Sequence, residues 1–97
     1  MAQQVSARDR IEVKEPRKFK VLIHNDDITP MDFVVDVLIS VFRYDTEQAI
    51  DLMLKVHYGT AAVVGTYSRD MAMTRALVAQ KMAREEGYPL RVTAEPE

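Results

Sequence analysis

The sequence predicts an α+β fold: a two-layer sandwich in which a small three-stranded antiparallel sheet packs against three helices, in the order β-α-α-β-α-β. Three short segments have the composition and bounding turn signals of strands, and three longer ones have apolar residues at helical spacing. A chain of 97 residues is about two-thirds of one typical domain, which predicts a single folding unit. Three strands form only one small sheet, so we expect the helices to cover one of its faces.

The first strand is expected directly after an N-terminal tail. Residues 1–17 have no sustained apolar period and end near Pro16, which predicts a flexible tail before a domain at 18–97. From Lys18 to His24 the residues alternate as in a strand, and three apolar ones share the inner face: Phe19, Val21 and Ile23. The next three residues favour a turn because they bond to their own backbone: Asn25, Asp26 and Asp27.

The next two segments have the spacing of amphipathic helices. Thr29 is expected as the N-cap and Pro30 as the first residue of a helix that runs to about Arg43. Asp45 and Gln48 form a capping pair, which predicts another helix from Glu47 to about His57. Because the link between them is short, we expect the two helices to be near-antiparallel neighbours.

The last third of the chain completes the pattern. Gly59 is expected to end the second helix, and residues 61–67 have the composition of a second strand. Ser68 is the predicted cap of an alanine-rich helix that extends to Gly87. Residues 89–94 are expected to form the last strand.

Composition excludes several classes of protein. The chain has 13 Lys and Arg against 15 Asp and Glu, and this balance argues against a nucleic-acid partner. It has no cysteine, which excludes disulfides and thiol catalysis. No apolar run approaches the roughly 18 residues of a membrane span. We therefore expect a cytoplasmic protein with no membrane partner.

The charges are unevenly distributed along the chain. Residues 21–65 contain seven acidic side chains and two basic ones, whereas residues 1–20 contain six basic and three acidic ones. Two interpretations of the acidic centre stay open. Its carboxylates cap helices and cover solvated helix faces, or they form an acidic recognition surface.

Catalytic and metal-binding interpretations have little support in the sequence. Two histidines and two aspartates could ligate a metal, but His24, Asp26, Asp27 and His57 do not have the spacing of a ligand set. There is no nucleophile elbow and no phosphate-binding glycine loop. We therefore expect no enzyme activity, no cofactor and no metal.

Two methionines suggest a different kind of site. Met31 lies at a helix start beside the acidic turn, and Met53 lies one turn before His57. Methionines most often fill cores, and His57 could simply complement the helix dipole. Alternatively, the methionines rim an apolar pocket next to a carboxylate pair. Such a pocket suits a ligand with a cationic end and a large apolar side chain.

Several segments resemble the ClpS family. The main one is Lys20 to Val34 (KVLIHNDDITPMDFV), and shorter ones follow at the family's spacings: Met53 to His57, Gly65 to Tyr67, Ala83-Arg84 and Pro89-Leu90. The resemblance implies a non-catalytic adaptor of the bacterial N-end rule pathway. Such adaptors bind proteins with N-terminal Leu, Phe, Tyr or Trp and deliver these N-degron substrates to the unfoldase ClpA of the ClpAP protease.

The resemblance also implies the residues of the site. Four would bind the α-amino group, which is largely cationic at neutral pH: Asn25, Asp26, Asp27 and His57. Eight would line the pocket for the first side chain: Ile23, Ile28, Thr29, Met31, Val34, Met53, Val56 and Leu90. Two would contact the N-terminal domain of the unfoldase: Asp70 and Arg75. Family members use the N-terminal tail to trigger handover to the unfoldase.

Three positions depart from the family pattern. Ile28 replaces a common Tyr, Thr60 follows Gly59 where a Gly is usual, and Met73 replaces an acidic residue. These changes suggest a divergent or second-copy member with altered specificity or docking. We expect a monomer, and the sequence does not rank Leu, Phe, Tyr and Trp. The alternative is a helix-face interaction or dimerisation module without an N-terminal-residue pocket.

Overall fold

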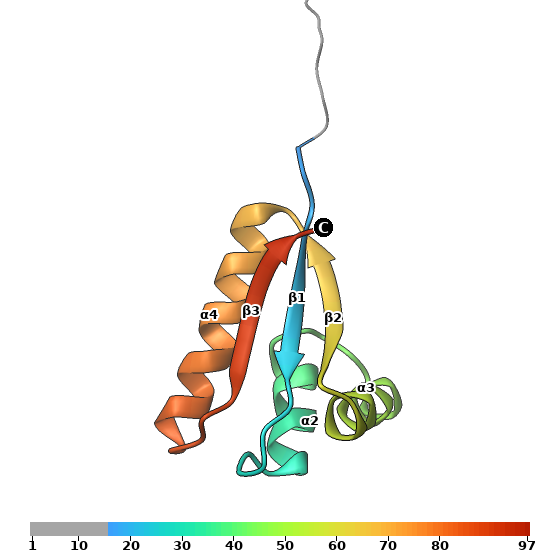
Figure 1. Cartoon of the computed structure of the whole chain (residues 1–97), viewed down its shortest axis with the longest axis vertical. Coiled ribbons are helices and arrows are strands. Elements are labelled where there is room, and N and C mark those ends of the chain that lie inside the picture. Colours follow the sequence, from blue (N-terminus) through green and yellow to red (C-terminus); the bar gives the residue numbers. More distant parts are fainter. Residues whose placement is uncertain (1–15) are drawn as a thin grey trace, which may run out of the picture.

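The computed structural model describes residues 16–97. Its helices and strands follow the predicted order (Figure 1): β1 (Phe19–His24), α2 (Met31–Ser40), α3 (Thr46–Tyr58), β2 (Ala61–Tyr67), α4 (Arg69–Glu85) and β3 (Arg91–Pro96). The predicted α+β class and element order are therefore confirmed. Of the expected tail, only Pro16 and Arg17 lie within the described residues; both are exposed and outside any helix or strand. No helix in this described part is long and apolar enough to cross a membrane.

The three strands form one antiparallel sheet in the order β2-β1-β3, with β1 in the centre. Val21 lies opposite Gly65 and Leu22 opposite Val63, so Val64 is an extra residue on β2. Such a bulge bends the strand and leaves a backbone group without a ladder partner. The hydroxyl of Tyr44 donates to the Val64 carbonyl at 2.5 Å and satisfies it.

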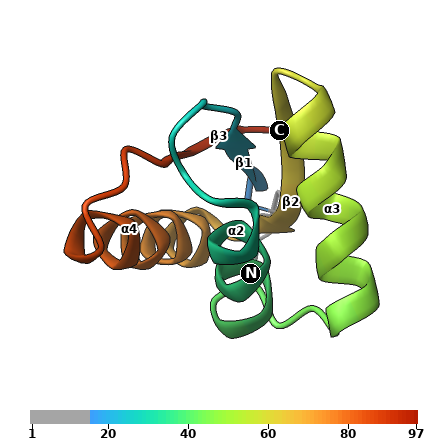
Figure 2. The same cartoon turned by 90° about the horizontal axis from the view of Figure 1, so that it is seen from below.

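The helices lie on one side of the sheet, as the sequence predicts, and the other face is open (Figure 2). On β1 the alternation places Val21 and Ile23 toward the helices, where both are fully buried. Leu22 and His24 lie on the open face and are half-buried. The sheet thus has one apolar and one mixed face, which is typical of antiparallel sheets covered on one side.

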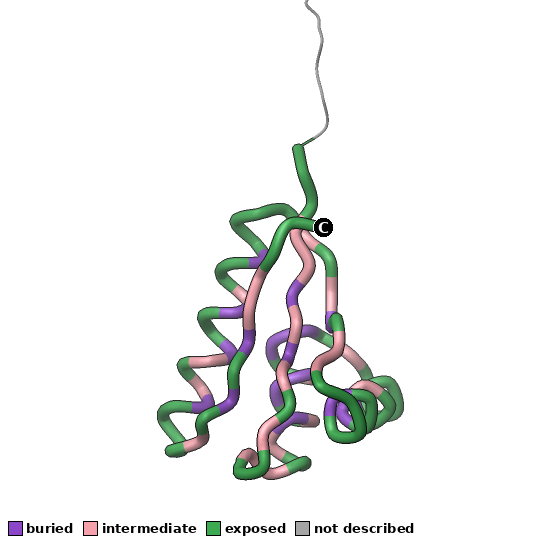
Figure 3. The backbone as a smooth tube through the Cα atoms, in the orientation of Figure 1, coloured by how far each residue is buried: buried purple, intermediate pink, exposed green. Residues whose placement is uncertain are grey.

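The core lies between the sheet and the helices, where the buried positions gather (Figure 3). Val37 and Leu38 from α2 are fully buried in it. The buried face of α4 consists of alanines: Ala72, Ala76, Ala79 and Ala83. Their spacing places them in one stripe, and small side chains let a helix lie close against a sheet. Larger residues there would overpack the core.

Two expectations about α2 and α3 are wrong. Helix α2 ends at Ser40 instead of continuing to Arg43, because the chain turns at Arg43, which has φ 65°. The Tyr44 N–H closes this turn by donating to the Leu38 carbonyl at 3.1 Å. The helices pack together, but their axes cross steeply instead of running antiparallel (Figures 1 and 2). The left-handed residue redirects the chain out of the path of α2.

Candidate binding site

A pocket lies where the β1–α2 turn, the C-terminal part of α3 and the loop before β3 meet. About 270 Å³ of space there is free of atoms, part of it open to solvent. Its lining residues come from segments far apart in sequence: His24, Asn25, Asp26, Thr29, Met31, Val34, Met53, Val56, His57 and Leu90. Most of the residues that the sequence predicted for the amine site and the apolar pocket are thus brought together.

The carboxylate of Asp26 organises the β1–α2 turn. It accepts hydrogen bonds from the N–H of Ile28 at 2.8 Å, the N–H of Thr29 at 2.7 Å and the hydroxyl of Thr29 at 2.9 Å. Thr29 is therefore not the N-cap of α2, and that prediction is wrong. Pro30 occupies the N-cap and makes no side-chain bond there, because a proline ring has no hydrogen-bonding group; the Thr29 hydroxyl donates to Asp26.

These contacts determine the charge of Asp26. Its partial burial acts to raise the pKa of the carboxyl, but the hydrogen bonds from Thr29 and Ile28, with the nearby positive charge of Arg84, outweigh burial and lower the pKa below 3.8. Asp26 is consequently ionised at neutral pH. A fixed negative charge lies at the polar end of the pocket.

Two more polar residues complete this end. The N–H of Asn25 donates to the Thr60 carbonyl at 2.9 Å, which ties the β1–α2 turn to the turn between α3 and β2. His57, in the last turn of α3, is exposed and its ring meets that of Tyr58 edge to face, with centroids 4.7 Å apart. Asn25 and His57, from two different segments, thus both line the pocket.

The rest of the pocket is apolar. Val34 of α2, Met53 and Val56 of α3, and Leu90 of the loop before β3 are all buried. Met31 is 45% exposed and lies at the first residue of α2. The walls thus belong to three segments whose side chains are packed in the core, whereas Met31 is a partly exposed, flexible side chain.

His24 also lines the pocket, although the sequence predicts it for neither the amine site nor the apolar pocket. Its Nε2 shares a hydrogen bond with the Thr93 hydroxyl at 2.8 Å, between β1 and β3. Burial and the positive charge of Arg91 lower the pKa of His24 below 6.5, against a smaller opposing effect of Glu95. The cross-strand position of His24 follows from the register, which the sequence does not contain.

Three predicted residues do not line the pocket. Ile23 is fully buried in the core, as its place on the inner face of β1 already indicated. Ile28 is 69% exposed, and Asp27 is exposed in the turn beside Asp26. Ile28 and Asp27 therefore lie outside the lining of the pocket, on the turn that forms one of its edges.

The expected unfoldase contacts are unlike each other. Asp70 is almost fully exposed and lies 3.9 Å from Arg69. Arg75 is half-buried: a guanidinium nitrogen donates to the Val41 carbonyl, and the guanidinium lies 5.2 Å from the centroid of the Tyr67 ring. Arg75 therefore links α4 to the end of α2, and its role in docking stays a prediction.

The arrangement can bind a small group that is cationic at one end and apolar at the other. Negative charge and polar atoms lie at one end of the hollow, and buried aliphatic side chains lie at the other. Within residues 16–97 there is no group of three or more His, Cys, Asp or Glu side chains placed to hold a metal ion.

Comparison with known proteins gives a consistent result. The family model "ATP-dependent Clp protease adaptor protein ClpS" matches residues 14–93. The chain is 51% identical over 84 residues to an ATP-dependent Clp protease adapter protein ClpS of Oleidesulfovibrio alaskensis, an alignment that covers 87% of this chain and 81% of the relative. It is 48% identical over 89 residues to the ClpS of Deinococcus radiodurans, covering 92% and 79%.

One solved structure is also similar. The Agrobacterium tumefaciens ClpS2 bound to L-phenylalaninamide superposes with a TM-score of 0.84 at 41% identity. The match covers 86% of this chain and 100% of that one. The fold described above is therefore the fold of that protein.

Proposed function

Because the chain belongs to the ClpS family, whose members are adaptor proteins of the ATP-dependent Clp protease and not enzymes, we propose which proteins it recognises. It binds proteins whose first residue is Leu, Phe, Tyr or Trp and delivers them to a ClpA-type unfoldase. The observation that carries this proposal is a single pocket with an ionised carboxylate and polar groups at one end and buried aliphatic walls at the other.

The polar end recognises the α-amino group. A free amino terminus is mostly cationic at neutral pH. Asn25 and His57, which both line the pocket, each carry a side-chain acceptor for it. Asp27 supplies the countercharge from the edge of the turn, aided by Asp26. Hydrogen bonds to a charged group contribute roughly 1.5–3 kcal/mol each. Acetylation removes the charge, so a blocked terminus loses this contribution.

The apolar end takes the first side chain. Met53, Val56 and Leu90 form walls that are already dry in the core, so the protein needs little rearrangement to receive an apolar group. Burying a Leu or Phe side chain contributes roughly 1.5–3 kcal/mol. Ile23 supports the pocket from behind, and Ile28 lies at its edge.

The ligand of the solved relative has the same two parts. L-phenylalaninamide combines a free α-amino group with a phenyl side chain, and it is bound by the Agrobacterium protein. The chain described here places Asn25, His57 and the aliphatic walls around one hollow. This correspondence supports the proposal that a Phe-like terminus is a ligand here too.

Delivery requires a second surface, which we place at the start of α4. The side chain of Asp70 is almost fully exposed, so a partner can reach it, and Met73 nearby is exposed. Arg75 contributes positive charge while anchoring the helix. In this proposal the protein acts as a cytoplasmic monomer that binds the N-terminal domain of the unfoldase.

The test is a titration with four peptides of identical sequence after the first residue. They begin with free Leu, free Phe, acetylated Leu and acetylated Phe, and binding is followed by fluorescence anisotropy. We expect binding of the two free peptides only, and its loss in Asp27→Ala and His57→Ala variants that keep the far-UV circular dichroism of the wild type. Equal affinity for free and acetylated peptides would overturn the proposal.

The same titration tests a helix-face interaction or dimerisation module. Large apolar side chains on α4 are exposed, among them Leu77 at 67%, and this observation favours a protein contact on that helix. A module that uses α4 alone would bind free and acetylated peptides equally or bind neither.

A further inference from the structure

The loop between α4 and β3 carries the pocket residue Leu90, and contacts of Arg84 and Tyr88 hold this loop in place. We propose that Arg84 and Tyr88 are positioning residues that hold the Leu90 wall of the pocket at a fixed place relative to Met31, and so determine which first side chains fit. This inference rests on the proposed function, because it concerns the same pocket. Neither Arg84 nor Tyr88 lines the pocket.

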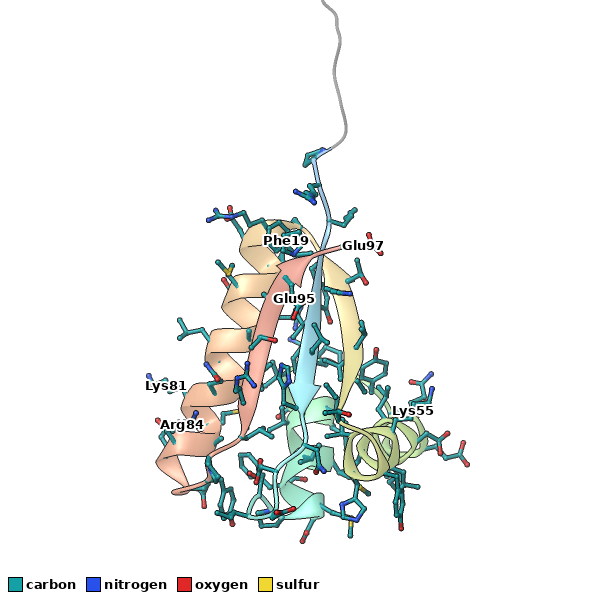
Figure 4. All side chains as sticks on the ribbon, in the orientation of Figure 1. Phe19, Lys55, Lys81, Arg84, Glu95 and Glu97 are labelled. Carbon is teal, nitrogen blue, oxygen red and sulfur yellow. The ribbon has the colours of Figure 1, made fainter. Side chains whose placement is uncertain are left out.

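Arg84 binds the loop directly. One guanidinium nitrogen donates to the carbonyl of Tyr88 and to the carbonyl of Leu90, both at 2.8 Å. Figure 4 shows Arg84 on the last part of α4, near this loop. The intervening Pro89 has no N–H to donate. Arg84 thereby fixes the backbone on both sides of Pro89.

Tyr88 fastens the same loop to α2. Its ring meets that of Phe33 edge to face, with centroids 4.9 Å apart, and its N–H donates to the Ala83 carbonyl at 2.8 Å. Edge-to-face aromatic pairs stabilise a fold by more than the burial of their surface area alone. The loop is therefore tied to α4 through its backbone and to α2 through its side chain.

The two residues of this aromatic contact are close in sequence to Met31 and Leu90, the pocket residues that the proposal concerns. Phe33 follows Met31 by two residues in α2, and Leu90 follows Tyr88 by two residues in the loop. The Phe33–Tyr88 contact thus links the segment that carries Met31 to the segment that carries Leu90. Leu90 is 1% exposed, so its position depends on the backbone that carries it.

The charge of Arg84 also reaches the polar end of the pocket. It is one of the influences that lower the pKa of the Asp26 carboxyl, and Asp26 holds the turn that leads to Met31. Arg84 therefore acts on both sides of the hollow, on one through hydrogen bonds and on the other through charge. A neutral side chain of similar length removes both effects.

The first experiment measures selectivity. Wild type, Arg84→Met, Arg84→Lys and the matched control Arg69→Met are titrated with L-phenylalaninamide and L-alaninamide by NMR. We expect Arg84→Met to lower the ratio of the two affinities by about threefold to tenfold, Arg84→Lys to recover part of it, and Arg69→Met to leave it unchanged. Global destabilisation would scale both affinities together and leave the ratio intact. An unchanged ratio in folded Arg84→Met would overturn the inference.

A second measurement needs no ligand. Amide hydrogen exchange in the free protein is compared at Tyr88 and Val92, on the two sides of Leu90, and at Ile23 as a reference. We expect about tenfold faster exchange at the first two positions in Arg84→Met, with no change at Ile23. Equal exchange rates in the wild type and in Arg84→Met at these two positions would refute the positioning role of Arg84. If the wild type binds neither amide, the proposed function fails, and the exchange rates still decide the role of Arg84.

Tyr88→Leu serves as the second variant. It removes the ring contact to Phe33 and keeps an apolar side chain of moderate size. It therefore tests whether the loop is held in position even if Arg84→Met does not fold. We expect faster exchange at Val92 and a lower ratio of affinities, as in Arg84→Met. Wild-type behaviour of Tyr88→Leu in both measurements would contradict a positioning role for Tyr88.

Discussion

Replacing Asp26 by alanine separates the structural role of the acidic turn from its role in binding. Asp26 and Asp27 are neighbours with the same side chain, but only Asp26 accepts bonds from the Ile28 N–H, the Thr29 N–H and the Thr29 hydroxyl. We expect Asp26→Ala to destabilise the fold. Asp27→Ala is the matched control, which removes an exposed carboxylate and leaves the free energy of unfolding within about 0.5 kcal/mol.

The magnitude follows from the three hydrogen bonds. An intramolecular hydrogen bond contributes roughly 0.5–1.5 kcal/mol net, and more when one partner is charged. The three bonds of Asp26 share one half-exposed turn, so their contributions are not additive and water replaces part of them. We therefore expect Asp26→Ala to lower the free energy of unfolding by about 2 kcal/mol at pH 7.

The pH dependence provides an independent check. The pKa of Asp26 in the folded protein lies below the value of 3.8 of the unfolded chain, so the unfolded state binds the proton more readily and the stabilisation is present above pH 3.8. As the pH falls through the folded-state pKa, this stabilisation is lost. The stability difference between wild type and Asp26→Ala should therefore shrink in acid.

Urea unfolding followed by circular dichroism measures these differences at pH 7 and at several values below 3.8. Peptide binding is measured on the same samples at pH 7. We expect Asp27→Ala to lose about tenfold or more in affinity for a free Phe terminus, because a charged partner is removed. A loss below about 0.5 kcal/mol in Asp26→Ala, or one that does not change with pH, would refute the role assigned to its carboxylate.

Other contacts lead to further predictions. Tyr44→Phe removes the donor to the Val64 carbonyl and should cost about 1 kcal/mol in urea unfolding; no change would mean that water satisfies the bulge equally well. His24→Gln should flatten the decline in stability below pH 6.5, because burial lowers the pKa of His24 and the unfolded chain takes up the proton first; an equal decline in both proteins would contradict this. Arg75→Met should destabilise by about 1–2 kcal/mol through its lost contact with Val41, whereas Asp70→Ala should leave stability unchanged. Equal midpoints for the Arg75 and Asp70 variants would argue against the internal role of Arg75.

Local patterns predicted the elements well where one signal dominated. The capping box of Asp45 and Gln48 is present, with Asp45 accepting from the Gln48 N–H at 2.8 Å, and Ser68 caps α4 as expected. Predictions failed where a side chain had two partners to choose from. Thr29 could cap α2 or bond to Asp26, and only the folded turn decides between them.

The strand β3 illustrates a similar limit. The sequence predicts it at 89–94, whereas it spans Arg91–Pro96. The carbonyls of Tyr88 and Leu90, which precede the strand, accept hydrogen bonds from Arg84 on α4. No local sequence pattern indicates that an arginine on the preceding helix donates hydrogen bonds to this loop. The same applies to His24, whose bond to Thr93 depends on strand register.

Local sequence patterns predict the α+β class, the order of the elements and the acidic turn, and the resemblance to the ClpS family implies most of the residues that line the pocket. Periodicity, capping residues and short motifs depend on neighbours along the chain, so they can be recognised without a structure. Folding, by contrast, decides which of two adjacent aspartates holds the turn, that Arg75 contacts internal partners, and that Arg84 donates to the Leu90 carbonyl. Those roles depend on groups that only folding brings within hydrogen-bonding distance.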